Sequence, residues 1–344
     1  MEQHFWDEQY KKDFTIGNKN FQSIYRVKQI LENDSFVTIK EYLLQKGKDS
    51  ENKKATELYE REIKLIKELA NSNCENFVKF IKEKKEVSDE KEENYLFIVR
   101  EYCFGNLEDF ITMNGNKLEP GLIQLIMKQL NNAFKILRDK KIIHRNIKPS
   151  NILFCYDEDK NYLMKLSGLN YYKKENKSCP PINNSDFPNL PAGLNNENEN
   201  YDLWCIGIIM YFMCFGNYET DNISGINDKD LKDLIEKCIK NTISWNDYFN
   251  HKFFKKNYPD YNDNEENAVI NKEDIVLLEK YKNELEKFTN NLNRMYMDFN
   301  AIKEKEKKKE KINSDFPKLK NDYEAIDKLY KNINDLYLKL NKNS

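Results

Sequence analysis

The sequence predicts an α+β chain in three parts: a strand-rich first lobe, a helical second lobe and a C-terminal helical coiled-coil segment. Apolar and polar residues alternate near the N-terminus, the apolar spacing becomes helical after Gly105, and near the C-terminus apolar residues recur three and four positions apart in turn. The expected boundaries are 12–103 and 104–256 for the two lobes, 257–270 for a polar linker and 271–342 for the last part.

The first lobe is predicted to be a small antiparallel sheet with one helix. Residues 14–46 alternate apolar and polar positions and are rich in β-branched and aromatic types, which is typical of successive strands. Apolar positions three and four apart then predict a helix over Lys54–Ala70. Two more strands are expected at Phe77–Val87 and Tyr95–Tyr102, joined by the charged loop VSDEKEEN.

The second lobe is predicted to be helical. The expected helices are Leu107–Met113, Gly121–Asp139, Tyr201–Phe215, Leu231–Lys240 and Trp245–His251.

Composition and charge narrow the function classes. The 344 residues carry a formal net charge of -2, so no excess positive charge favours nucleic acid or an anionic membrane surface as partner. The longest apolar run, Trp204–Phe215, is too short to cross a bilayer, and the N-terminus lacks an apolar stretch of signal-peptide length. Seven cysteines form no CxxC pair, and their odd number rules out complete intramolecular pairing. We therefore expect a cytoplasmic protein in a reducing compartment.

Two heptad series occupy the last part of the chain. Their apolar positions are Leu278, Tyr281, Leu285, Phe288, Leu292, Met295, Phe299 and Ile302 in the first, and Phe316, Leu319, Tyr323, Ile326, Tyr330, Ile333, Tyr337 and Leu340 in the second. This spacing predicts coiled-coil packing. The helices pair as a hairpin within the chain, or between chains as a homo-oligomer or with another protein, or merely pack on the second lobe.

The segment Ile142–Phe154, IIHRNIKPSNILF, carries the most informative motif. It closely resembles the catalytic loop HRDxKPxN of eukaryotic-type protein kinases, and other segments between Phe14 and Phe254 match that family in the expected order. The resemblance implies a bilobal protein kinase fold over residues 12–256, and Lys148 is typical of the Ser/Thr type. It also implies ATP and magnesium (Mg2+) as ligands.

The phosphate end of the implied nucleotide site is partly kept. By the resemblance, Lys40 in the strand VTIK takes the place of the lysine that holds the α- and β-phosphates, and Glu62 takes the place of its ion-pair partner. Of the glycine loop G-x-G-x-x-G only Gly17 remains, with Lys19 and Gln22 at the other glycine positions. Glycine serves there because the backbone must approach phosphate closely. We expect weakened phosphate contact, with an ordinary β-hairpin as the alternative.

The apolar end of that site is better kept. The resemblance places Ile24 and Thr38 in the roof of an adenine pocket and Leu153 in its floor, and the segment LFIVREYC supplies the hinge, with Glu101 and Cys103. We expect ATP to bind weakly and largely without metal, or not at all.

The catalytic loop has lost its base. Asn146 stands where the family has the Asp that accepts or orients the substrate hydroxyl proton. A neutral amide takes up no proton at useful pH, and general-base help is worth roughly 10²–10⁴-fold in rate. The family residues Arg145, Lys148 and Asn151 remain, and they imply contact with the activation segment, a catalytic-loop lysine and one Mg2+ ligand.

The metal-binding motif is altered as well. Family members read Asp-Phe-Gly where this chain reads Gly168-Leu169-Asn170, so the Mg2+-holding Asp is replaced by Gly168, and no Asp lies between Leu163 and Asn176. Mg2+ demands oxygen ligands in near-octahedral geometry. The sequence therefore predicts a poor fit for Mg2+, with Asn151 as its one remaining protein ligand.

The gatekeeper position of the family, just before Glu101, holds Arg100. A guanidinium there must be paired or hydrated. Pairing with Glu62 would take that carboxylate from Lys40 and partly fill the pocket. The alternative is that Arg100 extends to solvent.

The activation segment, Tyr171 to about Leu190, has no clear APE motif, and Phe187–Asn189 is its nearest match. In the closing motif, Thr242 replaces the usual Arg, so the family's Glu–Arg ion pair is lost at both ends. Losing both members leaves no uncompensated buried charge. Asp202 takes the place of the residue that anchors the catalytic loop.

These departures predict a pseudokinase that acts as a binding, scaffolding or allosteric module with little or no phosphotransfer. Its expected partners are proteins, bound through the coiled coil and the kinase-like lobes. The alternative is an atypical active Ser/Thr protein kinase, for which Lys40, Glu62, Lys148 and Asn151 speak. A phosphotransfer assay separates the two.

Overall fold

The chain divides into two units, residues 1–267 and residues 268–344. The computed structural model describes residues 10–19, 21–29, 35–88, 93–156, 162–174, 179–180 and 194–258. All of these belong to the first unit. The predicted coiled coil at 271–342 and all but the first two residues of the predicted linker lie outside the described residues.

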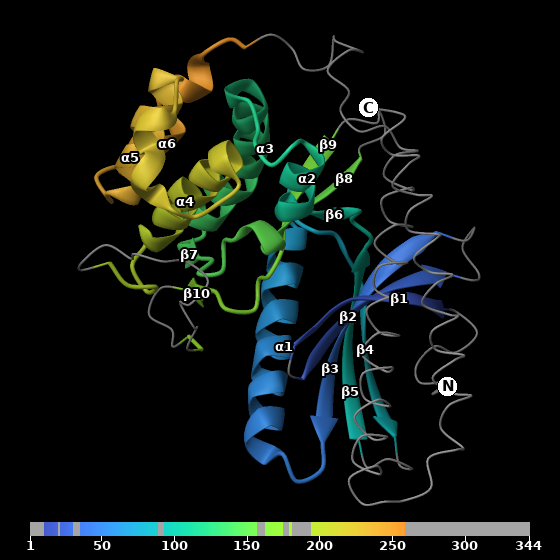
Figure 1. Ribbon diagram of the computed structural model, residues 1–344. Coiled ribbons are helices and arrows are strands. Elements are labelled where there is room, and N and C mark those ends of the chain that lie inside the picture. The colour runs from blue at the N-terminus through green and yellow to red at the C-terminus, as the bar shows by residue number, and fades with distance from the viewer. Residues whose placement is uncertain are drawn as a thin grey trace, which may run out of the picture. The chain divides into compact units, whose positions relative to one another are not determined.

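A five-stranded antiparallel sheet and one long helix build the N-lobe (Figure 1). The strand order is β1-β2-β3-β5-β4. The elements are β1 (Tyr10–Lys19), β2 (Gln22–Gln29), β3 (Phe36–Gln45), α1 (Asp49–Ala70), β4 (Phe80–Ser88) and β5 (Glu93–Glu101).

Helix α1 and strand β4 start away from their predicted positions for identifiable reasons. Helix α1 begins at Asp49 rather than Lys54, because its polar first turns show no apolar period while Asp49 and Glu51 favour a helix N-terminus. Strand β4 begins at Phe80 rather than Phe77, because Phe77 forms an isolated bridge with Leu166 of the other lobe.

Alternation along the strands gives the sheet two different faces. Odd-numbered residues of β3 and β5 join one apolar cluster and even-numbered ones join the cluster under α1. The first cluster is Tyr10, Val27, Val37, Ile39, Tyr95, Phe97 and Val99, and the second is Tyr42, Ala55, Leu58, Tyr59, Ile63, Leu96 and Ile98. Because side chains alternate with period two, Thr38, Lys40 and Arg100 lie on the α1 face of the sheet.

Helices dominate the C-lobe, as predicted (Figure 1). Helix α4 forms its centre, and every residue from Tyr201 to Met213 is buried. The helices are α2 (Leu107–Met113), α3 (Pro120–Asp139), α4 (Tyr201–Phe215), α5 (Lys229–Ile239) and α6 (Trp245–Phe249), with 3-10 turns at Pro149–Asn151, Thr220–Gly225 and Lys252–Lys255. Short strands are β6 (Gly105–Asn106), β7 (Ile142–Ile143), β8 (Ile152–Tyr156), β9 (Tyr162–Leu166) and β10 (Lys173–Lys174).

The end of β9 joins the two lobes. The Leu166 amide donates to the Asn76 carbonyl at 2.7 Å, and the Leu166 carbonyl accepts from the Val78 amide at 3.2 Å. Beside them, Lys165 forms an ion pair with Glu101 at 2.9 Å. The segment after Leu166, which carries the altered metal motif, is thereby held against the N-lobe.

Two further observations concern the chain's chemistry. None of the seven cysteines forms a disulfide. Within the described ranges, no helix combines the length and the apolar character that a membrane span requires.

Candidate functional site

A buried ion pair marks the N-lobe side of the cleft. Lys40 Nζ lies 2.6 Å from Glu62 Oε2, and the two side chains are only 7% and 3% exposed. The Tyr42 hydroxyl donates to the same oxygen at 2.6 Å. Burial acts to raise the pKa of Glu62, but Lys40 and the Tyr42 hydrogen bond outweigh it and leave that pKa below its ordinary value. Glu62 is therefore a charged acceptor held by two donors.

Arg100 lies beside this pair without joining it. It is paired in the sheet with Thr38, two residues from Lys40 and on the same face. The pKa of Lys40 and the pKa of Glu62 depend first on burial and on the charge of the other residue. The charge of Arg100 adds a smaller effect that lowers both values. The predicted alternative of an Arg100–Glu62 pair is wrong, because Lys40 and Tyr42 hold that carboxylate.

The guanidinium of Arg100 is incompletely satisfied. Its Nε is buried and has no hydrogen-bond partner. Arg100 forms no ion pair in the part of the chain that the structure describes. The side chain as a whole is partly exposed rather than fully extended into solvent.

The predicted roof residues share the Lys40 face. Ile24 pairs with Lys40 across β2 and β3, and Thr38 is buried next to it along β3. Leu153 lies on β8 of the C-lobe, opposite Asn106. The register therefore brings the roof residues and Lys40 together on one face.

At the hinge, Glu101 turns toward the protein. Its Oε1 accepts the Lys79 amide at 2.6 Å and pairs with Lys165. Cys103 is buried beside Cys155, and the hydrogen bond that its thiol donates to Cys155, together with burial, raises the pKa of the Cys103 thiol well above its usual value. At Gly17 in the β1–β2 hairpin, an added Cβ would meet nothing within 4 Å, so internal packing does not demand glycine there.

Asp202 anchors the catalytic loop from α4. Its two carboxylate oxygens accept the backbone amides of His144 at 2.6 Å and Arg145 at 2.9 Å. Burial raises the pKa of Asp202 to about 6, against the pull of these amides. Arg145 adopts a φ of 66°, which two amide anchors on one carboxylate help to hold.

His144 is a buried, neutral part of this loop. Its Nε2 lies 3.0 Å from the Ser167 carbonyl, and its Nδ1 accepts the Asn146 amide at 3.2 Å. These partners assign the proton to Nε2. Burial lowers the pKa of His144 to about 4.

The two altered chemical positions contact each other. Asn146 Nδ2 donates to the Gly168 carbonyl at 3.3 Å, and Asn151 Nδ2 donates to the Asn146 carbonyl at 2.8 Å. Gly168 has a φ of 78°, and a Cβ there would stand 2.7 Å from the Asn151 carboxamide. The amide of Asn151 thus fills the space beside Gly168, and Asn146 uses a donor where the family has an acceptor.

These residues do not fit Mg2+. Gly168 supplies no ligand atom, Asn146 turns an N–H toward Gly168, and Asn151 offers at most one neutral oxygen. Among the residues that the structure describes, no group of three or more His, Cys, Asp or Glu side chains is arranged to hold a metal ion. Lys148 lies just before the Pro149–Asn151 turn, and its carbonyl accepts the Asn151 amide at 2.9 Å.

Arg145 binds the start of the activation segment, a residue within it and a residue that follows it. Its guanidinium donates to the carbonyls of Tyr171 and Pro180, both at 3.0 Å, and to the carbonyl and side chain of Asn196 at 2.8 and 3.0 Å. Strand β10 pairs with β7 directly in front of the catalytic loop. The strand pairing fixes the start of the segment, and the groups that accept hydrogen bonds from Arg145 are all neutral.

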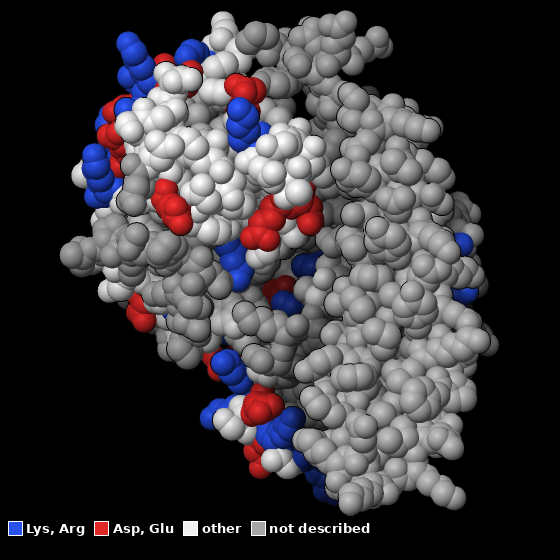
Figure 2. All heavy atoms as spheres, viewed as in Figure 1, with Lys and Arg blue, Asp and Glu red and all other residues white. Residues whose placement is uncertain are grey.

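Helix α1 is tied to the same segment. Arg61 donates to the Tyr172 carbonyl and stacks over the Tyr172 ring at 4.6 Å. Glu68 pairs with Lys174 at 2.8 Å. These contacts hold α1, and with it Glu62, toward the cleft. Figure 2 shows charged side chains of both signs on this face of the described lobes.

One connection was not predicted from the sequence. Asn170, at the position of the motif's Gly, is buried and hydrogen-bonds the Tyr42 hydroxyl. Tyr42 in turn bonds Glu62, so a polar chain links the altered metal motif to the ion pair. Tyr42 stands two residues after Lys40, and strand alternation was the one signal that could have identified it.

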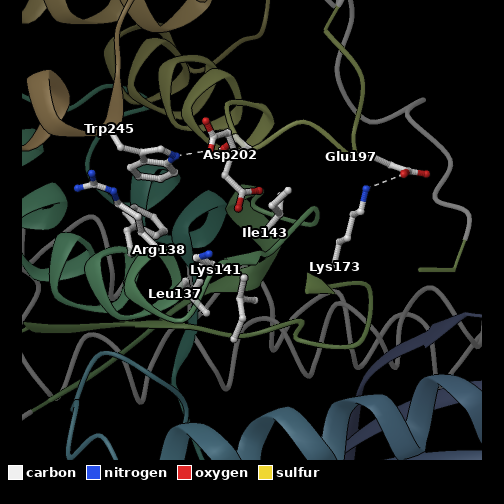
Figure 3. A pocket seen from close by; sticks show the side chains of 11 residues that line it. Leu137, Arg138, Lys141, Ile143, Lys173, Glu197, Asp202 and Trp245 are labelled. Carbon is white, nitrogen blue, oxygen red and sulfur yellow. Dashed lines mark hydrogen bonds and ion pairs between the residues drawn. The ribbon is translucent and has the colours of Figure 1, made fainter. Parts of the chain in front are cut away.

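A hollow of about 510 Å³ opens on the C-lobe, away from the Lys40 pair (Figure 3). Trp245 and Arg138 line it, and its rim carries a Lys173–Glu197 ion pair at 2.8 Å. Trp245 Nε1 donates to the Glu199 carbonyl at 3.1 Å. Among the described residues, Thr242, at the family's Arg position, bonds the Lys237 carbonyl and no carboxylate. Trp245 and Arg145 hold the segment near residues 196–199.

The family comparison agrees with this architecture. The model for the protein kinase domain matches residues 10–319. The chain belongs to the protein kinase family. Its similarity to curated Ser/Thr kinases confirms a eukaryotic-type Ser/Thr kinase domain.

Three relatives illustrate that similarity. The chain is 29% identical over 279 residues to the serine/threonine-protein kinase atg1 of Dictyostelium discoideum, covering 73% of this chain and 40% of the relative. It is 27% identical over 293 residues to the putative serine/threonine-protein kinase R517/R518 of Acanthamoeba polyphaga mimivirus, covering 70% and 62%. It is 26% identical over 287 residues to the serine/threonine-protein kinase unc-51 of Caenorhabditis elegans, covering 74% and 32%. The chain thus matches less than two thirds of each relative's length.

Proposed function

We propose that this kinase domain is a pseudokinase, a binding and scaffolding module that transfers no phosphate. The observation that carries the proposal is the contact among Asn146, Asn151 and Gly168. In this corner each amide donor is used within the protein, and the space beside Gly168 is filled by Asn151. A corner arranged in this way supplies no base, and it offers a metal at most the one neutral oxygen of Asn151.

The chemistry follows from what phosphoryl transfer needs. The protein's part is positioning together with electrostatic stabilisation by metal ions and cations. Lys40 and Glu62 keep one positioning element. Without a carboxylate at residues 146 and 168, neither the substrate hydroxyl nor a bridging metal is held, and the general-base contribution of roughly 10²–10⁴-fold is lost.

A radiometric phosphotransfer assay on the full chain tests this proposal. ATP is supplied with Mg2+ or Mn2+, together with a generic Ser/Thr substrate pool and the chain itself as acceptor. The expected labelling equals that of the Lys40→Met variant, which lacks the phosphate-holding cation. Labelling well above that variant would contradict the proposal.

A second candidate function is an atypical active Ser/Thr kinase. The specific observation in its favour is that α1, the ion pair and the start of the activation segment are all held in position by contacts within the protein. The names of the relatives also describe kinases. The same assay decides between the two, because only this candidate predicts labelling that Lys40→Met abolishes.

We further propose a cytoplasmic module that recruits protein partners through its lobes and its heptad segment. The two heptad series support this part, since coiled-coil seams require a partner helix. Light scattering on the full chain measures the mass in solution. A mass above that of one chain supports pairing between chains, and the mass of one chain supports a hairpin or a different protein partner.

A further inference from the structure

Arg100, at the family's gatekeeper position, has one buried donor that no residue of the described structure satisfies. Arg100 shares the α1 face of the sheet with Thr38 and Lys40, and cross-strand diagonal neighbours on one face lie within reach of long side chains. Its Nε is buried without a hydrogen-bond partner. Burying such a group is unfavourable unless something pairs with it.

The charge balance of the cleft points to an anion. Lys40 and Arg100 supply two positive charges, and among the described residues Glu62 on α1 is the one carboxylate bonded to either of them. Compared with the family pattern, two carboxylates are replaced by Asn146 and Gly168 and one cation is added. The cleft has therefore moved toward positive charge at the same positions where metal binding was lost.

We propose that Lys40 and Arg100 together form the phosphate-binding pair of a metal-free site for an oligophosphate anion, such as the phosphate chain of a nucleotide. In ordinary kinases metal ions neutralise those phosphates. Here the guanidinium takes over part of that neutralisation, as its planar fork of donors suits phosphate oxygens. The inference rests on the proposed function, since it assumes that no metal is held at residues 151 and 168.

Two consequences distinguish an Arg100 that binds an anion from an Arg100 that merely fills the pocket. Replacing Arg100 by Met removes an unsatisfied buried donor, so the ligand-free protein should melt at or above the wild-type temperature. The same change should weaken binding of the anion roughly tenfold or more, as expected for loss of a charge-assisted hydrogen bond. If Arg100 merely filled the pocket, replacing it would open the pocket, and the anion would bind as tightly as before or more tightly.

The experiment is a titration of the full chain in EDTA, followed by calorimetry and by melting temperature. The ligands are ATP, inorganic tripolyphosphate and adenosine. The proteins are wild type, Arg100→Met and the control Arg138→Met, which removes an exposed arginine on α3 of the C-lobe. Ligand binding to the folded state raises the melting temperature, and at a fixed ligand concentration the rise is larger for a tighter ligand.

The expected result is that ATP binds wild type and Arg138→Met equally and Arg100→Met at least tenfold more weakly. Tripolyphosphate acting like ATP identifies free oligophosphate as sufficient, and ATP acting alone identifies a nucleotide. Both support the role of Arg100. Binding that Arg100→Met leaves unchanged or strengthens would overturn the inference, as would adenosine binding as tightly as ATP.

Failure of this inference and failure of the proposed function look different. Phosphotransfer by the wild-type chain in Mg2+ would contradict the pseudokinase proposal, regardless of the ATP affinity that Arg100→Met shows in EDTA. Absence of phosphotransfer, combined with an unchanged ATP affinity in Arg100→Met, would contradict this inference alone.

Discussion

The two walls of the cleft have changed to very different extents. The N-lobe wall keeps Lys40 and Glu62 as a buried pair with Tyr42 as an added donor. On the C-lobe wall, neutral Asn146 and Gly168 take the place of two carboxylates and bond to each other. Both walls are well packed, but only the first retains the charges of a kinase.

Burial explains which charges stayed. Removing one member of a buried ion pair leaves an uncompensated charge in a low-dielectric site, so Lys40 and Glu62 depend on each other. A carboxylate that faces a metal or a substrate has no such protein partner, and once the ligand is lost a neutral side chain suits the site better. This chain therefore keeps the family's charges where they pair within the protein, and differs from the family pattern where the charges would face a ligand.

The largest effect on stability is expected from removing the carboxylate of the buried pair on the N-lobe wall. Glu62→Gln leaves both Lys40 and Arg100 without a nearby carboxylate, and should lower the free energy of unfolding by about 3–5 kcal/mol. Denaturant unfolding measures this. The control Glu60→Gln, an exposed change on the same helix, should stay within about 0.5 kcal/mol of wild type. Equal effects of the two changes would show that the pair contributes little.

The next effect tests whether the altered wall is filled. Gly168→Ala places a Cβ 2.7 Å from Asn151 at a φ of 78°, and should destabilise the fold by about 2–3 kcal/mol. Gly17→Ala meets nothing within 4 Å and serves as the matched control, with an expected change below about 0.5 kcal/mol. A neutral Gly168→Ala would mean that space for a side chain persists at the family's Asp position.

A third prediction concerns the pH dependence of stability that arises from His144 in the catalytic loop. The folded-state pKa of His144 is about 4, below its ordinary value of 6.5, so the unfolded chain binds the extra proton between these values. Stability from this group is therefore present above pH 6.5 and falls as the pH drops toward 4. Asp202, with its pKa raised to about 6, acts in the opposite direction between its ordinary value and 6, so the two must be separated.

Comparison with His144→Gln isolates the histidine. The unfolding free energy of wild type minus that of the variant should fall by about 2 kcal/mol from pH 7 to pH 5. Glutamine keeps a donor for the Ser167 carbonyl without titrating. A difference that does not change with pH would show that His144 titrates normally in the fold.

The smallest effect concerns the link between the walls. Tyr42→Phe removes one hydrogen bond to the charged Glu62 and one to Asn170, and should destabilise the protein by about 1–2 kcal/mol. Made in the Glu62→Gln background, the same change should have a smaller effect because the charged acceptor is gone. Full additivity of the two changes would argue that Tyr42 does not act through Glu62.

Sequence reasoning located the fold and the main residues because kinase motifs tie residue type to a place in the chain. The Lys40 strand, the catalytic loop and the C-lobe helices were found in this way. The early start of α1 was missed because its first turns are polar. The family membership is now shown, while the roles predicted for the individual site residues stay predictions.

What sequence could not supply was distance. Two cations, Lys40 and Arg100, competed for Glu62, and only the structure shows that Lys40 holds it. The Asn146–Gly168 contact joins residues far apart in the chain, and no local pattern signals it. Asn170 was likewise invisible as a partner of Tyr42, because its bond crosses between the lobes.

The most direct test of the contrast between the two walls is the effect of Mg2+ on ATP affinity, measured by calorimetry on the full wild-type chain. Excess Mg2+ should leave the affinity measured in EDTA unchanged or lower it, because the C-lobe wall offers the metal no carboxylate. An affinity that rises tenfold or more on adding Mg2+ would contradict the loss of the metal site.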